Sequence, residues 1–227
     1  GAAQCLKSNP NKMSKFILIP RESGIYKGQS PLIIDAPKGF VFHHVNAFEE
    51  GKEIILDSIF YDDFPSVGPD ENFREIDFNT YPEGKLKRSI INIEERSSEL
   101  KKISDQCCEF ATVNPNFLGL KSEFSWMAST EQKSGNAPLQ AIKKINLITQ
   151  EEVFWSASPR GFVSEPIMVP KENSSSEDEG FLFTVVWNGE RRGSDLVILN
   201  SNDMLELAVY ELPINIPHGL HGSWSNN

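Results

Sequence analysis

The stretch FVFHHVNAFEEGKEIILDSI, residues 40–59, indicates the fold class of this chain. It contains two short apolar runs, Phe40–His44 and Ile54–Ile59, and Gly51, a residue that favours turns, lies between them. Short apolar runs bounded by turn residues are typical of β-strands. The stretch therefore predicts two strands joined by a turn.

The same pattern continues along the rest of the chain, where Gly, Pro, Asn and Asp separate short β-branched runs. No segment has the sustained 3.6-residue period of a long amphipathic helix. Ser97–Asp105 has weak helical character, but Leu100–Ile103 within it fits a strand equally well. The further predicted strands are Phe16–Ile19, Leu32–Ile34, Leu86–Ile93, Phe110–Val113, Phe124–Ala128, Leu139–Leu147, Val153–Trp155, Ile167–Val169, Phe181–Trp187, Leu196–Leu199 and Leu205–Leu212.

About thirteen short strands predict an all-β chain, which would fold as a sandwich, a barrel or a propeller. In four-stranded blades they would make a little over three blades, fewer than a closed propeller needs. We expect the sheets to be three or four in number and antiparallel. The most polar loop is Lys171–Gly180 (KENSSSEDEG), for which the composition predicts a mobile surface loop.

The composition excludes several classes of protein. The 227 residues include 32 acidic and 22 basic side chains, a net charge of −10 that repels phosphate backbones, so no nucleic-acid partner is expected. No segment has the ~20 consecutive apolar residues that span a bilayer, and Gly1–Lys15 is too polar for a signal peptide. Cys5, Cys107 and Cys108 cannot all pair within one chain, which favours free thiols and a cytoplasmic location.

The histidines form two pairs, His43–His44 and His218/His221, near opposite ends of the chain. Successive side chains of a strand point to opposite faces, so a single metal ion could take only one residue of His43–His44. A core histidine beside an exposed one is the alternative interpretation of that pair, and the more common one for two adjacent histidines. His221 lies among glycines, which allow close backbone approach but are also typical of a flexible tail.

Two glutamates adjoin apolar residues. Glu109 follows Cys107–Cys108, and Glu165 lies in GFVSEPIMVP. A buried carboxylate needs a partner, and a metal-bound histidine commonly donates its second ring N–H to one. A set of histidines and glutamates without thiolates suits ferrous iron as well as zinc, although each glutamate could equally face solvent at a strand end. No nucleotide-binding, GxSxG or HExxH pattern is present.

Five blocks of the sequence resemble blocks of the carotenoid cleavage oxygenases, and they occur in the same order as in that family. The first, Phe40–Glu50 (FVFHHVNAFEE), is similar to the FHxxNAFE signature of that family. Two further segments, Ile54–Ile59 and Ser134–Leu139 (SGNAPL), resemble the retinal-forming branch of the family. The resemblance to the family covers essentially the whole chain. The other four of the five blocks are Gln106–Phe110 (QCCEF), Gly161–Pro170 (GFVSEPIMVP), Glu177–Gly180 (EDEG) and His218–Trp224 (HGLHGSW).

The resemblance implies part of a seven-bladed β-propeller with a ferrous ion, Fe(2+), held on its axis by four histidines. It makes His43 the third ligand and His221 the fourth. It makes Glu109 and Glu165 two of three glutamates that accept hydrogen bonds from the ligands, and it places Phe42 on the wall of the substrate tunnel. The resemblance makes His44 the poorer match to a ligand. His218 stands where members of the family often have an aromatic residue, so it is not expected to be a ligand.

The first two histidine ligands and the first glutamate of the family belong to an N-terminal half that this sequence does not contain. Residues 1–227 are therefore expected to be the C-terminal half of the propeller domain, without a complete metal site of their own. The resemblance implies an iron-dependent dioxygenase that uses O₂ to cleave the 15,15′ double bond of an apocarotenal and gives retinal.

The resemblance adds no organic cofactor and leaves open a peripheral contact with membranes. Two alternatives to the expected activity stay open. The chain could be a non-catalytic propeller fragment that serves as a scaffold, or part of a related oxygenase that cleaves stilbenes or other carotenoids.

Overall fold

The structure is a computed structural model that describes residues 9, 12–65, 75, 77, 78, 80–133, 135, 136 and 138–225. The predicted thiol of Cys5, and Ser134 and Ala137 of the SGNAPL block, lie outside the described residues. None of the described residues belongs to a helix that is long and apolar enough to cross a membrane.

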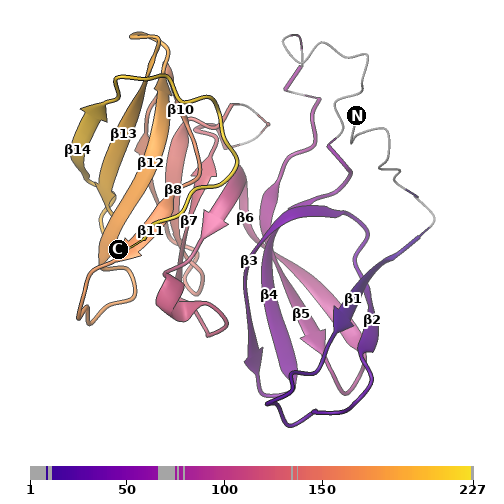
Figure 1. The fold of residues 1–227 in the computed structure, drawn as a ribbon. Helices are drawn as coiled ribbons and strands as arrows, with labels where there is room; N and C mark the ends of the chain where they lie inside the picture. Colours follow the sequence, from indigo (N-terminus) through magenta and orange to yellow (C-terminus); the bar gives the residue numbers. More distant parts are fainter. Residues whose placement is uncertain are drawn as a thin grey trace.

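The prediction of an all-β chain is confirmed (Figure 1). Apart from one short 3₁₀ helix, η1 (Pro115–Phe117), the regular elements of the described chain are strands, and each predicted run overlaps one of them. The strands are β1 (Ser14–Leu18), β2 (Leu32–Ala36), β3 (Phe40–Glu50), β4 (Glu53–Tyr61), β5 (Lys85–Asn92), β6 (Ser97–Thr112), β7 (Phe124–Ser129), β8 (Ala141–Asn146), β9 (Glu152–Ser156), β10 (Gly161–Val163), β11 (Ile167–Pro170), β12 (Gly180–Asn188), β13 (Gly193–Asn200) and β14 (Glu206–Glu211).

The segment Ser97–Asp105, for which helix and strand were both open, lies in the long strand β6. Its first half pairs with β5, and its second half pairs with β7 on the other edge. Backbone hydrogen bonds to two neighbouring strands outweigh a weak local preference for helix. One long strand therefore links two groups of strands within the seven-stranded sheet β3 to β9.

The sheets follow one another along the chain. Strands β3 to β6 form the first four-stranded group, β6 to β9 the second, and β12, β13 and β14 with the short β10 and β11 the third. The hairpin β1–β2 forms a separate two-stranded sheet, and all strand pairs are antiparallel. The described residues thus form three antiparallel sheets, of two, five and seven strands, within the expected three or four. Four antiparallel strands in chain order are the unit of a β-propeller blade, and the groups β3 to β6 and β6 to β9 have this form.

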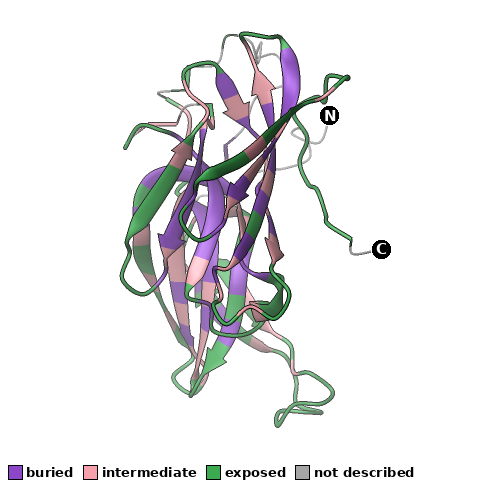
Figure 2. Cartoon of the chain, turned by 90° about the vertical axis from the view of Figure 1, so that its left-hand side faces the viewer, coloured by how far each residue is buried: buried purple, intermediate pink, exposed green. Residues whose placement is uncertain are grey.

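Two apolar clusters lie between neighbouring groups of strands. The cluster that includes Ile59, Leu86 and Met127 joins the first group to the second. The cluster around Trp126 and Leu182 joins the second group to the third. Figure 2 shows buried positions along the strands, whereas the turns and the C-terminal segment are exposed. These clusters fix the strand groups relative to one another, and they thereby position the side chains that different groups contribute to one site.

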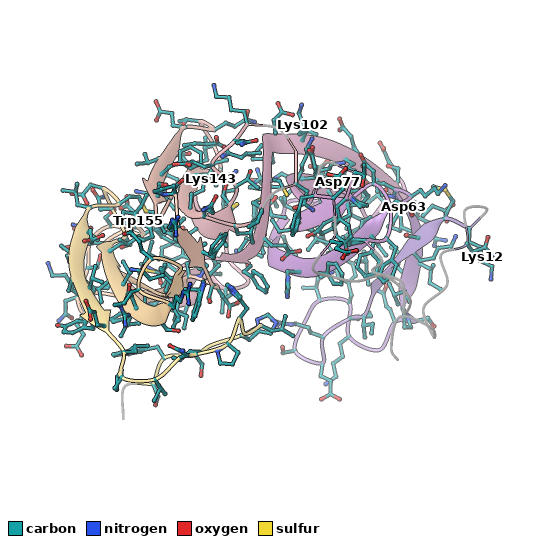
Figure 3. All side chains as sticks on the ribbon, turned by 90° about the horizontal axis from the view of Figure 1, so that it is seen from above. Lys12, Asp63, Asp77, Lys102, Lys143 and Trp155 are labelled. Carbon is teal, nitrogen blue, oxygen red and sulfur yellow. The ribbon has the colours of Figure 1, made fainter. Side chains whose placement is uncertain are left out.

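Two lysines that interrupt the apolar run of β8 are buried and paired. Lys143 is fully buried and lies 3.2 Å from Oε1 of Glu152, and Nζ of Lys144 lies 2.5 Å from Oδ2 of Asp178. In Figure 3 Lys143 lies inside the ribbon, whereas Lys102 lies at its rim. The lysines are part of the core because acidic partners from other segments reach them.

The loop predicted from KENSSSEDEG does join β11 to β12, but its last residues are held by hydrogen bonds. The carboxylate of Glu177 accepts bonds from the backbone N–H groups of Glu123 and Phe124, at the start of β7. Asp178 is 4% exposed and accepts a bond from Lys144. The EDEG block thus joins two strand groups, and its acidic residues are not simply solvent-facing.

Candidate metal centre

Two histidines from opposite ends of the chain meet at one point. Nε2 of His43, on β3, lies 3.3 Å from Nε2 of His221, although 178 residues separate them in sequence. Their ring centroids are 5.0 Å apart and the rings are nearly perpendicular. The predicted convergence of these two side chains is confirmed.

The neighbouring histidine points elsewhere. The pairing of β3 with β4 shifts on both sides of His44, whose Nδ1 lies 2.8 Å from the hydroxyl of Ser58 on β4. Burial, and to a smaller degree the nearby His43, lowers the pKa of His44. As predicted, only one side chain of the adjacent pair faces His221.

Glu109 on β6 holds the other side of His43. Its Oε2 lies 2.5 Å from Nδ1 of His43 and accepts the backbone N–H of Phe110 at 2.8 Å. Its Oε1 accepts the hydroxyl of Tyr61 at 2.9 Å. Phe110 has a φ of 55°, and the pairing with β7 shifts between Glu109 and Thr112. This β-bulge holds a non-glycine residue in a strained conformation, a local cost of about 1–3 kcal/mol that is typical of functional sites.

Glu165 holds His221 in the same manner. It lies between β10 and β11, and its Oε1 is 3.1 Å from Nδ1 of His221. Its Oε2 accepts the backbone N–H of Gly222 at 2.8 Å. Each histidine of the pair therefore has a carboxylate on the nitrogen that faces away from the other histidine.

The segment that carries His221 has no regular secondary structure after β14, but it is held along its length. The backbone N–H of Ile216 donates to the hydroxyl of Ser194 on β13 at 2.9 Å. Further on, the ring of Trp224 stacks on Phe183 of β12 with centroids 5.0 Å apart. Figure 1 shows this segment crossing from β14 over the face of the sheets. The contacts on both sides of His221 argue against a free tail.

The hydrogen bonds indicate which ring nitrogens carry protons. If Nδ1 of each imidazole donates to its carboxylate, each neutral ring presents a lone pair at Nε2. Two lone pairs that face each other at 3.3 Å repel unless a proton or a cation lies between them. Two nitrogens bound to one metal ion at about 2.0–2.1 Å are about 2.8–3.4 Å apart, so the observed spacing fits a shared cation.

The charge around the pair is also suited to a cation. Among the described residues, neither Glu109 nor Glu165 forms an ion pair with a lysine or an arginine. The two carboxylates would balance the charge of a divalent ion. Within the same part of the chain, no group of three or more histidine, cysteine, aspartate or glutamate side chains could hold a metal ion. The described chain therefore brings two imidazole nitrogens together, which by themselves do not complete a metal site.

An aromatic surface begins directly beside His43. Phe42 is 49% exposed, and its ring lies edge-on to Phe40 at 4.6 Å and to Tyr61 at 5.5 Å between centroids. Phe64 packs against the same group, 4.7 Å from Phe40. An exposed aromatic side chain next to the histidine pair suits apolar ligand contact. The role of Phe42 in a substrate tunnel stays a prediction.

The asparagine of FHHVNAFE has a structural role. Asn46 is 7% exposed, and its side-chain amide donates to the carbonyl oxygens of Phe117 and Leu120 at 3.2 and 2.8 Å. Its carbonyl oxygen accepts the N–H of Gly119 at 2.9 Å. One buried side chain thus satisfies backbone groups of the loop after η1, which explains the asparagine without assigning it to the metal.

Two contributors to the site were not found from the sequence. Tyr61 ends β4 and contacts Glu109, and Phe110 lies 5.2 Å from the ring of His43 and 6.1 Å from that of His221. The only signal for Tyr61 was chemical, since a tyrosine that ends an apolar strand needs a partner for its hydroxyl. The left-handed conformation of Phe110 had no sequence signal, because phenylalanine rarely adopts it.

The thiols next to Glu109 are expected to be unreactive. Cys107 and Cys108 are free and buried, and burial, the main cause, raises their pKa to about 12 and about 11 respectively. The thiolate is the reactive form, so iodoacetamide at about pH 8 should leave both unmodified in the native protein. Peptide mass mapping should show both alkylated in urea. Rapid native alkylation of either would contradict the described burial.

The chain is similar to known proteins over nearly its whole length. The family profile described as RPE65, retinal pigment epithelial membrane protein, matches residues 1–226. The chain is 39% identical to apocarotenoid-15,15′-oxygenase of Synechocystis sp., and the alignment covers 99% of this chain and 45% of that protein. It is 26% identical to lignostilbene-alpha,beta-dioxygenase isozyme III of Sphingomonas paucimobilis, over 92% of this chain and 46% of that protein.

A solved structure is similar throughout. Cobalt-substituted Synechocystis ACO has a TM-score of 0.94 and 38% sequence identity, and the match covers 100% of this chain and 47% of that one. The chain thus spans about half the length of the relatives that it matches.

Proposed function

Because this chain belongs to the RPE65 family, and its relatives include named carotenoid and apocarotenoid oxygenases, we propose that it is the C-terminal half of an iron(II)-dependent dioxygenase. The substrate that we propose is an apocarotenal, which is cleaved at its 15,15′ double bond. One oxygen atom of O₂ joins each carbon of the broken double bond, and the products are two aldehydes, one of them retinal.

One observation carries the proposal: the Nε2 atoms of His43 and His221 face each other, and a carboxylate oxygen lies within hydrogen-bond distance of each Nδ1. These two residues would hold Fe(2+) together with ligands from the other half of the enzyme. Bound ferrous iron supplies the redox chemistry toward O₂. The similarity to a protein described as cobalt-substituted supports a metal in a protein of this fold.

The other residues act on the ligands and on the substrate. Glu109 and Glu165 keep the protons on Nδ1, which orients each ring and makes Nε2 more basic. The exposed face of Phe42 would contact the apolar polyene beside the metal and keep water away from it. The free Cys107 and Cys108 support a reducing, cytoplasmic location, and an apolar substrate favours peripheral contact with membranes.

The test uses the complete polypeptide of which we propose this chain is one half. Iron is measured by elemental analysis, and retinal formed from an apocarotenal under O₂ is measured by chromatography. Glu109→Gln should keep the fold but reduce iron affinity or turnover by about 10–100-fold, since the amide lacks the charge that polarises His43. The control Glu190→Gln, in the exposed turn between β12 and β13, should match the wild type.

The alternatives predict other outcomes of the same assay. A stilbene cleaved in preference to the apocarotenal would favour the relationship to the lignostilbene dioxygenase. A protein that retains no iron and forms no aldehyde from either substrate would favour a non-catalytic scaffold. Wild-type iron content and turnover in Glu109→Gln would reject the role of that glutamate.

A further inference from the structure

The hydroxyl of Tyr61 has no role in the proposed function so far. It donates a 2.9 Å hydrogen bond to Oε1 of Glu109, the oxygen that does not contact His43. Tyr61 is 6% exposed and Glu109 is 8% exposed, so water does not compete freely for this bond. Burial, and then the carboxylate of Glu109, raises the pKa of Tyr61, which keeps the hydroxyl protonated as a donor.

The phenol ring of Tyr61 packs against Gly84, where the absence of a side chain leaves room for it. A Cβ atom at Gly84 would lie 2.6 Å from Cζ of Tyr61, 2.7 Å from its hydroxyl oxygen and 2.9 Å from the carbonyl oxygen of Cys108. The phenol therefore occupies space that only a glycine leaves free. The ring of Phe42 packs edge-on against Tyr61 at 5.5 Å. Packing against Gly84 and Phe42 thus holds the hydroxyl of Tyr61 in place independently of its hydrogen bond to Glu109.

The second carboxylate lacks such a donor. Glu165 contacts Nδ1 of His221 and the backbone N–H of Gly222, and no side-chain hydroxyl among the described residues donates to it. Among the described residues, only the carboxylate that contacts His43 is held by a side chain from a further element, Tyr61 at the end of β4.

We infer that Tyr61 is a positioning residue, whose hydroxyl fixes the carboxylate of Glu109 so that Oε2 stays on Nδ1 of His43. The orientation of His43, and with it the affinity for a divalent metal, then depends on a hydroxyl that touches neither the metal nor a ligand. The metal-binding part of this inference rests on the proposed function. The hydrogen-bonded coupling of Tyr61 to Glu109 does not.

The test removes only the hydroxyl. Tyr61→Phe in the complete polypeptide should weaken Co²⁺ affinity, measured by competition with a chelator, by about tenfold, the lower end of the range for groups that orient metal ligands. The matched control Tyr210→Phe, which removes an exposed hydroxyl on β14, should leave the affinity unchanged. In a Glu109→Ala background, Tyr61→Phe should change the affinity by less than about twofold, because its effect runs through the missing carboxylate.

Three results would overturn the inference. Wild-type Co²⁺ affinity in Tyr61→Phe would show that the hydroxyl only packs, and an equal loss in both backgrounds would show that it does not act through Glu109. If the wild type bound no Co²⁺, the proposed function would fail. Urea unfolding of the metal-free variants would then test the coupling between Tyr61 and Glu109. Additive effects of Tyr61→Phe and Glu109→Ala on the unfolding midpoint would then contradict the coupling. If Glu109→Ala does not fold, Glu109→Leu replaces it, because leucine also lacks an acceptor for the hydroxyl.

Discussion

Replacement of His43 by alanine is expected to remove iron from the complete polypeptide and to abolish cleavage. The change deletes one of the two Nε2 atoms that face each other at 3.3 Å. It also leaves Glu109, which is 8% exposed, beside an empty position, and an uncompensated buried charge is unfavourable. We expect a loss of iron affinity greater than about 100-fold, beyond the ~10–100-fold that changes in ligand-orienting groups cause.

The adjacent histidine supplies the control. His44→Ala removes an imidazole one residue away, but this ring contacts Ser58 on the other side of β3. Its iron content, measured by elemental analysis, should equal that of the wild type. Equal losses of iron in the two variants would contradict the assignment of His43 as the ligand.

Lys144→Met is expected to cause the largest loss of stability. Nζ of Lys144 lies 2.5 Å from Asp178 and 2.6 Å from the carbonyl oxygen of Asn202, and both charged side chains are less than 10% exposed. Removal of one partner of a buried ion pair typically costs about 3–5 kcal/mol of the free energy of unfolding. Urea unfolding at about pH 7 measures this difference.

The pH dependence of that loss follows from the pKa of Asp178. Burial alone would raise this pKa, but the hydrogen bonds from Lys144 and Ser176 outweigh it and the pKa is lowered. The stabilisation is therefore present above the ordinary aspartate pKa of about 3.9 and is lost as the pH falls through the lower folded value. The wild type and Lys144→Met should become more alike below about pH 4.

Lys171→Met is the matched control, because Lys171 forms an exposed ion pair with Glu179 in the same loop. It should unfold at the wild-type urea concentration, since exposed pairs contribute little. If Lys144→Met and Lys171→Met unfolded alike, the buried pair would not hold β8 to the loop before β12.

The strands could be predicted from the sequence because their apolar runs are local patterns. β10 was missed, since Gly161–Val163 is too short to show a period. The length of β6 was missed because it depends on two partner strands rather than on its own residues. Backbone pairing between distant segments decides such elements, and no local pattern records it.

The site divides in the same way. His43, His221, Glu109 and Glu165 were found through a resemblance of ordered blocks, and composition and spacing alone left each of them open. Tyr61 was not found, because its contact with Glu109 depends on the free space at Gly84.

The position of the bound metal tests the central claim most directly. Crystals of the complete polypeptide grown with Fe²⁺ would be measured at the iron absorption edge, where the anomalous signal locates iron independently of the protein. We predict one peak at about 2.1 Å from Nε2 of both His43 and His221, with Glu109 and Glu165 still on their Nδ1 atoms. An iron peak elsewhere in the protein, or a direct hydrogen bond between the two imidazoles with no iron beside them, would contradict it.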